Sequence, residues 1–94
     1  MFKVFVEYAL QEEARQSYLS FMRDKAAQDS RLGLYEGTDQ QGLFVEIWEG
    51  LTDAEYKHLK ALRTDESNPD WSPLLSWVSG GVSKVHIWHF RKVE

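Results

Sequence analysis

The sequence predicts one α+β domain in which a four-stranded antiparallel sheet is built from the order β-α-β-β-α-β. Apolar and polar residues alternate over residues 2–8 and 82–90, as in strands. Residues 12–28 contain neither glycine nor proline, and Ala14, Tyr18 and Met22 recur there at helical spacing, with Phe21 and Lys25 beside them. A chain of 94 residues has room for one core, so residues 1–94 are expected to form a single domain.

The middle of the chain predicts two strands, over residues 32–36 and 43–49, joined by a hairpin loop rich in glycine and polar residues. A helix over residues 53–64 follows, because Thr52 and Glu55 stand at the spacing of a capping box. Leu51 and Tyr56 have the spacing of a hydrophobic staple around the same helix start.

A short third helix is expected to begin at Ser72 and Pro73 and to end before Gly80 and Gly81, ahead of the last strand. The complete order is that of the ferredoxin-like fold, whose sheet order is 4-1-3-2.

Composition and charge exclude several classes of protein. Fifteen acidic and eleven basic side chains give a net charge of −4 without a run of like charge, so attraction to nucleic-acid phosphates is not expected. No apolar run approaches the roughly 20 residues of a membrane span, and Lys3 and Glu7 interrupt the apolar N-terminus, so no membrane or export segment is expected. The chain has no cysteine, which fits a reducing compartment, and we expect a cytoplasmic protein.

The alternation of the strands assigns side chains to two faces of the sheet. The face expected beneath the helices carries Phe2, Val4, Val6, Leu43, Val45, Ile47, Val85 and Ile87. The other face is expected to carry Phe5, Tyr35, Phe44, Trp48, His86, Trp88 and Phe90, together with Lys3, Glu7, Glu46 and Lys84. An aromatic surface of this size usually marks an interface or a ligand site.

The chain resembles the dimeric α/β-barrel superfamily, which includes antibiotic-biosynthesis-monooxygenase-like proteins, haem-degrading monooxygenases and stress-responsive barrel proteins. The resemblance spans nearly the whole chain and is carried by element order, by Glu7-Tyr8 at the end of the first strand, and by residues 43–48 and 85–90. It implies a homodimer in which two sheets face each other and enclose a partly apolar cavity in each subunit.

The resemblance implies a monooxygenase-like protein that acts on, or binds, a small aromatic or quinone-like molecule. The alternative is a non-enzymatic domain that binds a small ligand or another protein. Candidate ligand-binding residues are Phe5, Tyr35, Phe44, Trp48 and Trp88.

Three polar side chains are the candidate catalytic residues. Glu7, Glu46 and His86 are expected on one face of three adjacent strands, where they would supply an acid, a base and an imidazole. Cross-strand ion pairs, Glu7 with Lys84 and Lys3 with Glu46, explain the same charges without chemistry. His86 can equally be a structural histidine of the interface.

No metal or flavin is expected, because His86 and His89 point to opposite sides of a strand and no phosphate-binding loop is present. Haem stays open, with His58 or His86 as its axial ligand, although Glu7 stands where haem-degrading relatives carry asparagine. Trp71 and Trp77 either line a cavity mouth or simply pack.

RNA-recognition motifs share the ferredoxin-like fold and bind bases on their exposed sheet face. Residues 41–45 lack the basic residue and the aromatic spacing of their third-strand signature, and Glu7 and Glu46 would repel phosphate. No nucleic-acid partner is therefore expected.

Overall fold

The computed structural model describes residues 1–94 and contains one four-stranded antiparallel sheet in the order β2-β3-β1-β4. Its strands are β1 (Phe2–Ala9), β2 (Leu32–Glu36), β3 (Leu43–Glu49) and β4 (His86–Arg91). Its α-helices are α1 (Arg15–Gln28), α2 (Asp53–Arg63) and α3 (Ser72–Trp77), and its 3₁₀ turns are η1 (Glu12–Ala14) and η2 (Val82–Lys84). The predicted ferredoxin-like fold and strand order are confirmed.

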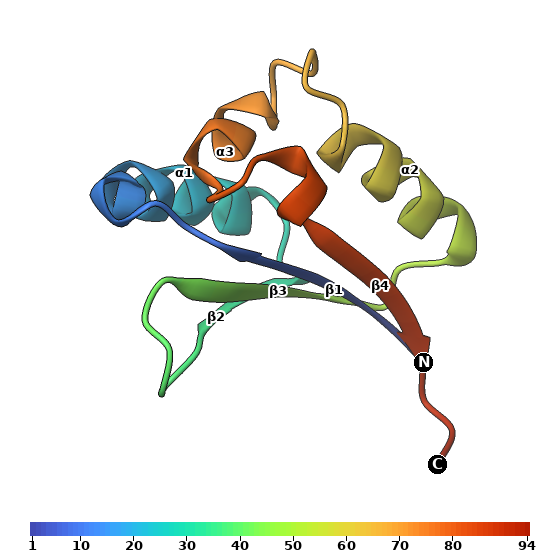
Figure 1. Ribbon diagram of the computed structural model, residues 1–94. Coiled ribbons are helices and arrows are strands. Elements are labelled where there is room, and N and C mark those ends of the chain that lie inside the picture. The colour runs from blue at the N-terminus through green and yellow to red at the C-terminus, as the bar shows by residue number, and fades with distance from the viewer.

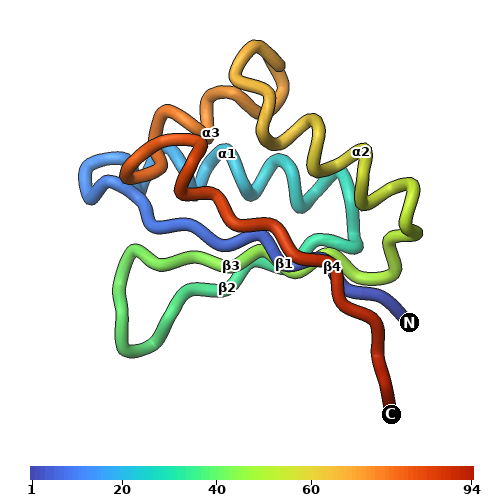
Figure 2. Tube along the Cα trace, turned by 45° about the vertical axis from the view of Figure 1, so that its right-hand side comes forward, coloured from blue at the N-terminus to red at the C-terminus, as the bar shows by residue number.

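The molecule has two layers. All three α-helices lie on one face of the sheet, and the opposite face is left uncovered (Figure 1; Figure 2). The two termini lie near each other at one end of the sheet, and the last residues run away from it (Figure 2). No helix has the length and apolar character needed to cross a membrane.

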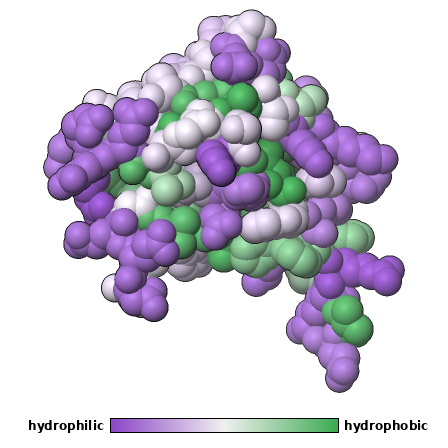
Figure 3. All heavy atoms as spheres, in the orientation of Figure 1, coloured by the Kyte–Doolittle hydropathy of each residue, from purple (hydrophilic) through white to green (hydrophobic).

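The core lies between the sheet and the helices because β1 alternates. Val4, Val6 and Tyr8 point toward the helices and are buried, whereas the residues between them are partly exposed. The helices contribute Tyr18, Met22, Leu59, Leu74 and Leu75 to the same core. Hydrophilic side chains cover much of the visible surface, with hydrophobic ones showing between them (Figure 3).

The face predicted for β3 is wrong. Phe44, Glu46 and Trp48 pair directly with residues of β1 that point toward the helices, and all three are buried. Residues directly opposite each other in an antiparallel pair share a face, so these three lie beneath the helices rather than on the uncovered face. This strand carries large apolar residues on both faces, so its alternation does not distinguish one face from the other.

The remaining differences are at element boundaries. The first helix begins with a 3₁₀ turn, and β4 begins at His86 rather than at residue 82. Gly80 and Gly81 adopt positive φ angles of 86° and 76°, and the amide of Lys84 bonds back to the Gly81 carbonyl, so the chain turns once more before the strand. Phe2, expected beneath the helices, is 38% exposed at the sheet's end.

The capping box at the start of α2 is confirmed. The Glu55 amide donates to Thr52 Oγ1 at 3.1 Å, and the Thr52 amide donates to Glu55 Oε1 at 3.0 Å. Both amides would otherwise be among the unpaired donors of the helix N-terminus. The start of α2 is thereby fixed next to the end of β3.

Replacing Thr52 by Ala should lower the free energy of unfolding by about 0.5–2 kcal/mol, because one helix amide loses its acceptor. Urea denaturation measures this loss. Thr64→Ala is the matched control, since the Thr64 hydroxyl donates to a carbonyl at the other end of α2 and caps no free amide. An equal or larger loss in the control would contradict the assignment.

Candidate functional site

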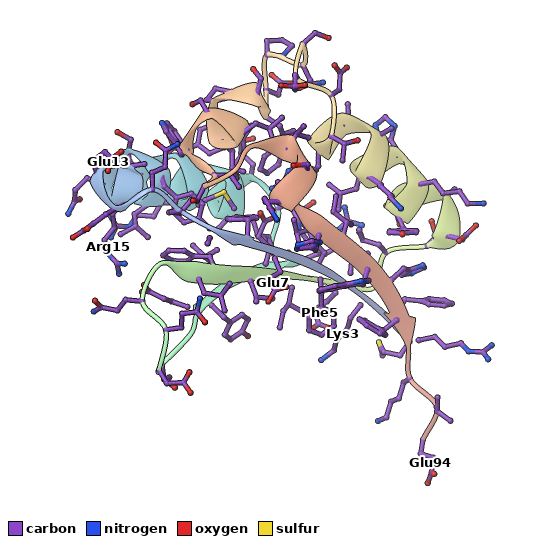
Figure 4. The ribbon with its side chains drawn as sticks, in the orientation of Figure 1. Lys3, Phe5, Glu7, Glu13, Arg15 and Glu94 are labelled. Carbon is purple, nitrogen blue, oxygen red and sulfur yellow. The ribbon has the colours of Figure 1, made fainter.

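The uncovered face carries part of the predicted site. Tyr35 and Trp88 are 58% and 45% exposed there, and Phe5 packs edge-on against Phe90 with 5.3 Å between ring centroids. Lys3, Phe5 and Glu7 all project to this side of β1 (Figure 4). Phe5, Tyr35 and Trp88 therefore lie on the predicted face, and their role in ligand binding stays a prediction.

Two of the three candidate catalytic residues lie together on this face. Glu7 pairs directly with His86 across β1 and β4, but no hydrogen bond joins their side chains. The His86 ring stacks on Trp88, with centroids 5.8 Å apart and the planes at 10°. A catalytic role for Glu7 and His86 stays a prediction, and Glu46 lies on the other side of the sheet.

The predicted cross-strand ion pair of Lys3 with Glu46 is wrong. Lys3 Nζ lies 3.4 Å from Glu49 Oε2, not beside Glu46. The predicted partner of Glu7, Lys84, belongs to η2 and not to β4. Lys3 meets Glu49 because the side chains of β3 point to the faces opposite to those predicted. Lys84 does not pair with Glu7 because β4 starts only at His86.

Glu46 is the centre of a buried polar network between the sheet and the helices. Arg63 of α2 donates two parallel hydrogen bonds of 2.6 Å to its two carboxylate oxygens. The Trp48 indole donates to Oε1 at 2.9 Å, and the Tyr8 hydroxyl donates to Oε2 at 2.5 Å. Both charged side chains are at most 1% exposed, so their charges are compensated by each other and not by water.

The network extends to α1 through two tyrosines. Since Tyr8 gives its only hydroxyl proton to Glu46, the 2.7 Å contact with Tyr18 is a hydrogen bond donated by Tyr18. Burial, reinforced by the Glu46 charge, raises the pKa of Tyr8 well above its usual value. Burial likewise raises the pKa of Tyr18. Both phenols therefore stay protonated and serve as donors.

Arg63 was not singled out from the sequence, although one signal was present. It stands four residues after Leu59, on the buried side of α2, where an unpaired charge would be costly. A buried arginine requires a buried acid, and Glu46 is the carboxylate at the middle of β3. Burial lowers the pKa of Arg63, but the charge and hydrogen bonds of Glu46 outweigh it, and the net shift is upward.

A groove of about 720 Å³ opens between α1 and α2 beside this network. Its apolar lining consists of Trp48, Leu51, Ala54, Leu59, Leu62 and Trp71. A volume of this order falls within the range of about 300–1,000 Å³ typical of small-molecule sites. The groove lies on the helix side of the sheet, so the predicted ligand-binding residue Trp48 lines it from a different face than expected.

Two indoles connect the groove to the network. Trp48 and Trp71 meet edge to face with 6.2 Å between centroids, and both line the groove. The Arg63 guanidinium lies 3.9 Å from the centroid of the Trp71 ring, a cation–π contact. The ion pair thus holds one wall of the groove in place. Phe44, also predicted to bind ligand, packs on Tyr18 in the core and does not line this groove.

The rim of the groove is charged. Arg31 donates to both carboxylate oxygens of Asp29, at 3.0 and 2.9 Å, and to Glu55 at 2.9 Å. The hydrogen bonds from Arg31 lower the pKa of Asp29. Hydrogen bonds from Thr52 and Arg31 likewise lower the pKa of Glu55. Lys25, His58 and Asp70 complete the ionisable lining.

The histidines and acids give little support to a metal centre. No three His, Asp or Glu side chains gather as possible ligands of one ion. His58 is exposed on α2 and lines the groove, whereas His86 lies on the opposite face of the sheet. Of the two candidate haem ligands, His58 alone borders this groove.

Comparisons with protein-family models and with curated proteins found no match. Among solved structures, an antibiotic biosynthesis monooxygenase superposes with a TM-score of 0.74 at 19% identity, over 100% of both chains. A conserved protein from Methanosarcina mazei Go1 superposes with a TM-score of 0.71 at 14% identity, over 97% of this chain and 91% of its own.

The chain shares the fold of antibiotic biosynthesis monooxygenase-like structures. A candidate antibiotic biosynthesis monooxygenase from Deinococcus radiodurans gives a TM-score of 0.70 at 14% identity, over 100% of this chain and 94% of its own. At such identities the similarity concerns the fold, and the function has to be argued from the residues of the site.

Replacing Arg63 by Met should lower the free energy of unfolding by about 3–5 kcal/mol, because Glu46 is left as a buried carboxylate without its counter-ion. The double variant Glu46→Gln/Arg63→Met should recover much of this loss, since no buried charge remains. Guanidinium denaturation of both single variants and the double variant gives the coupling energy.

Lys57→Met is the control, because Lys57 forms an ion pair with Asp53 at the exposed surface. It should cost less than about 1 kcal/mol. The buried network loses its assigned role if Arg63→Met is no more destabilising than this control.

Proposed function

We propose that the protein binds a small aromatic molecule in the groove between α1 and α2 and acts on it as a monooxygenase-like enzyme. The observation that carries the proposal is the pair of indoles, Trp48 and Trp71, in the wall of a groove of about 720 Å³. Both indoles are largely buried, at 5% and 8% exposed, and the part of each that borders the groove gives an aromatic ring apolar surface to contact.

The polar groups near these indoles support an aromatic ligand over a polar one. The Trp48 indole nitrogen already donates to Glu46, and the Arg63 guanidinium donates to both oxygens of the same carboxylate, which compensates its charge. The apolar lining is therefore left to contact ligand by its carbon surfaces. Charged groups at the rim, such as Arg31, then fix the orientation of the ligand's polar substituents.

The fold of the antibiotic biosynthesis monooxygenase-like structures supports the enzymatic part of the proposal. In such a reaction an electron-rich ring reacts with molecular oxygen, one oxygen atom enters the product, and the other leaves as water with electrons and protons from the substrate. The site's contribution is to hold the ring and exclude water. The apolar side chains of the groove would hold the ring, and a bound ligand would displace water from them.

Replacing Trp71 by Leu should weaken binding of 2-naphthol by roughly 2- to 12-fold, because an aromatic contact is lost while an apolar wall remains. Calorimetric titration measures the change. Trp77→Leu is the matched control, since Trp77 packs on the same Phe21 ring but does not line the groove.

Equal affinity in Trp71→Leu and wild-type protein would contradict the binding site. Oxygen uptake with 1,4-naphthohydroquinone, measured against the uncatalysed rate, distinguishes the enzyme from its alternative. Binding without any added oxygen uptake would favour a non-enzymatic ligand-binding domain.

We also propose that the uncovered face of the sheet is the contact between two copies of the chain. The exposed aromatic residues on this face are Tyr35, Trp88 and Phe90, and the Phe5 ring lies beside them. Exposed aromatic surface of this extent is unusual on a monomer, and a second copy would cover it by two-fold symmetry. The charged pair Lys3–Glu49 would lie at the edge of such a contact.

Light scattering at micromolar concentration should give about twice the chain mass of 11.0 kDa. Trp88→Glu should shift the mass to that of one chain, since a carboxylate would be buried without a partner. Trp88→Phe keeps the apolar surface and should remain dimeric. A wild-type monomer would refute the dimer and leave the face open to another protein.

A further inference from the structure

Lys25 is a cation in the groove that lacks a partner of opposite charge. It stands in the last turn of α1, and its ammonium lies 4.5 Å from the Trp71 ring centroid and 5.1 Å from that of Phe21. No carboxylate lies within ion-pair distance of Nζ, and no protein atom accepts a hydrogen bond from it. Its three N–H donors are therefore free for an acceptor from outside the chain.

The other two cations of this region are already neutralised. Arg63, on the Trp71 ring, is paired with Glu46, and Arg31, at the rim, is held by Asp29 and Glu55. Next to the Trp71 ring, the uncompensated positive charge is that of Lys25. The ammonium lies over the Trp71 ring, and both residues line the groove.

We propose that Lys25 binds an ionised oxygen of the ligand, so that the groove selects phenolates and aryl carboxylates over neutral aromatic molecules. This inference rests on the proposed aromatic site. The ligand's ring packs against the apolar lining of the groove, and its oxygen accepts a charge-assisted hydrogen bond from Nζ. An ionised phenol is also more electron-rich than the neutral form, which suits the proposed reaction with oxygen.

Other ionisable groups also face the groove, and their charges act on a ligand bound at Lys25. They are Asp29 and Arg31 just before β2, Glu55 and His58 on α2, and Asp70 before α3. The carboxylates of Asp29 and Glu55 are engaged by Arg31. Asp70 has no ion-pair partner and opposes an anionic ligand, so close contact with Nζ is needed for selection.

Two probes of equal ring size distinguish binding through the ligand's charged oxygen from binding through its aromatic ring. 4-Nitrophenol ionises near neutral pH and its phenolate absorbs visible light, whereas 4-nitroanisole has no ionisable oxygen. Dissociation constants are measured for both by calorimetry, with the visible spectrum of bound 4-nitrophenol recorded at a pH where the free probe is mostly neutral. The wild-type protein should bind the phenolate more tightly and show its absorbance there.

Lys25→Met should weaken 4-nitrophenolate binding by about 10- to 100-fold and leave 4-nitroanisole binding unchanged, because only the charged hydrogen bond is lost. Lys25→Arg should retain the preference for the phenolate. Lys60→Met is the matched control, since the Lys60 ammonium also lies over an aromatic ring, that of Tyr56, but outside the groove. Lys25→Gln replaces Lys25→Met if the latter fails to fold.

The outcomes separate this inference from the function on which it rests. If both probes bind wild-type and Lys25→Met protein equally, Lys25 only covers the indole, and the inference fails while the aromatic site stands. If neither probe binds the wild-type protein, the aromatic site itself fails, and the inference with it.

Discussion

The ion pair between Glu46 and Arg63 fixes the relation of the sheet to the helices. Its carboxylate accepts hydrogen bonds from β1, from β3 and from α2, and Tyr18 connects α1 to the same network. Desolvating two charges is costly, and complete hydrogen bonding is what offsets that cost. A shift of α2 along the sheet would break both parallel bonds at once, so we infer that the pair specifies this packing of the helix.

The groove depends on the same pair. Arg63 lies against the Trp71 ring, Trp71 meets Trp48, and Trp48 donates to Glu46. This ring of contacts holds the two indoles at the groove wall, and the polar groups next to them are already hydrogen bonded to one another. The sheet thus has two different faces: one lines, with the helices, the groove proposed to bind a ligand, and the other carries the aromatic surface proposed to join two copies. Function in this account is divided between the faces.

The sequence was sufficient for the fold, because β1 alternates cleanly and the Thr52 capping box marks the start of α2. It was not sufficient for β3, whose Leu43, Val45 and Ile47 are as apolar as the residues on its other side. The face of that strand is decided by Arg63, which needs a buried carboxylate opposite it. The pairing joins residues distant in sequence, so no local period could reveal it.

Site contacts between segments distant in sequence were missed for the same reason, because no local pattern shows them. Trp71 could be named as a residue near a cavity mouth, but its contact with Trp48 and Arg63 depends on how three segments pack. Lys25 falls within the helical pattern of α1, and only the structure places its ammonium over Trp71. Glu7 and His86 were expected on one face of adjacent strands and lie there, but the predicted partner of Glu7 was Lys84. Alternation extends back to residue 82, so it did not reveal that β4 starts only at His86.

The most direct test of the account follows the four tryptophan indole signals in a ¹H–¹⁵N correlation spectrum while 2-naphthol is added. Trp48 and Trp71 line the groove, Trp88 lies on the uncovered face, and Trp77 lines no groove. If the ligand binds in the groove, the signals of Trp48 and Trp71 shift with ligand concentration while that of Trp88 stays in place. A shift of Trp88 with Trp48 and Trp71 unmoved would place the ligand on the opposite face and contradict the account.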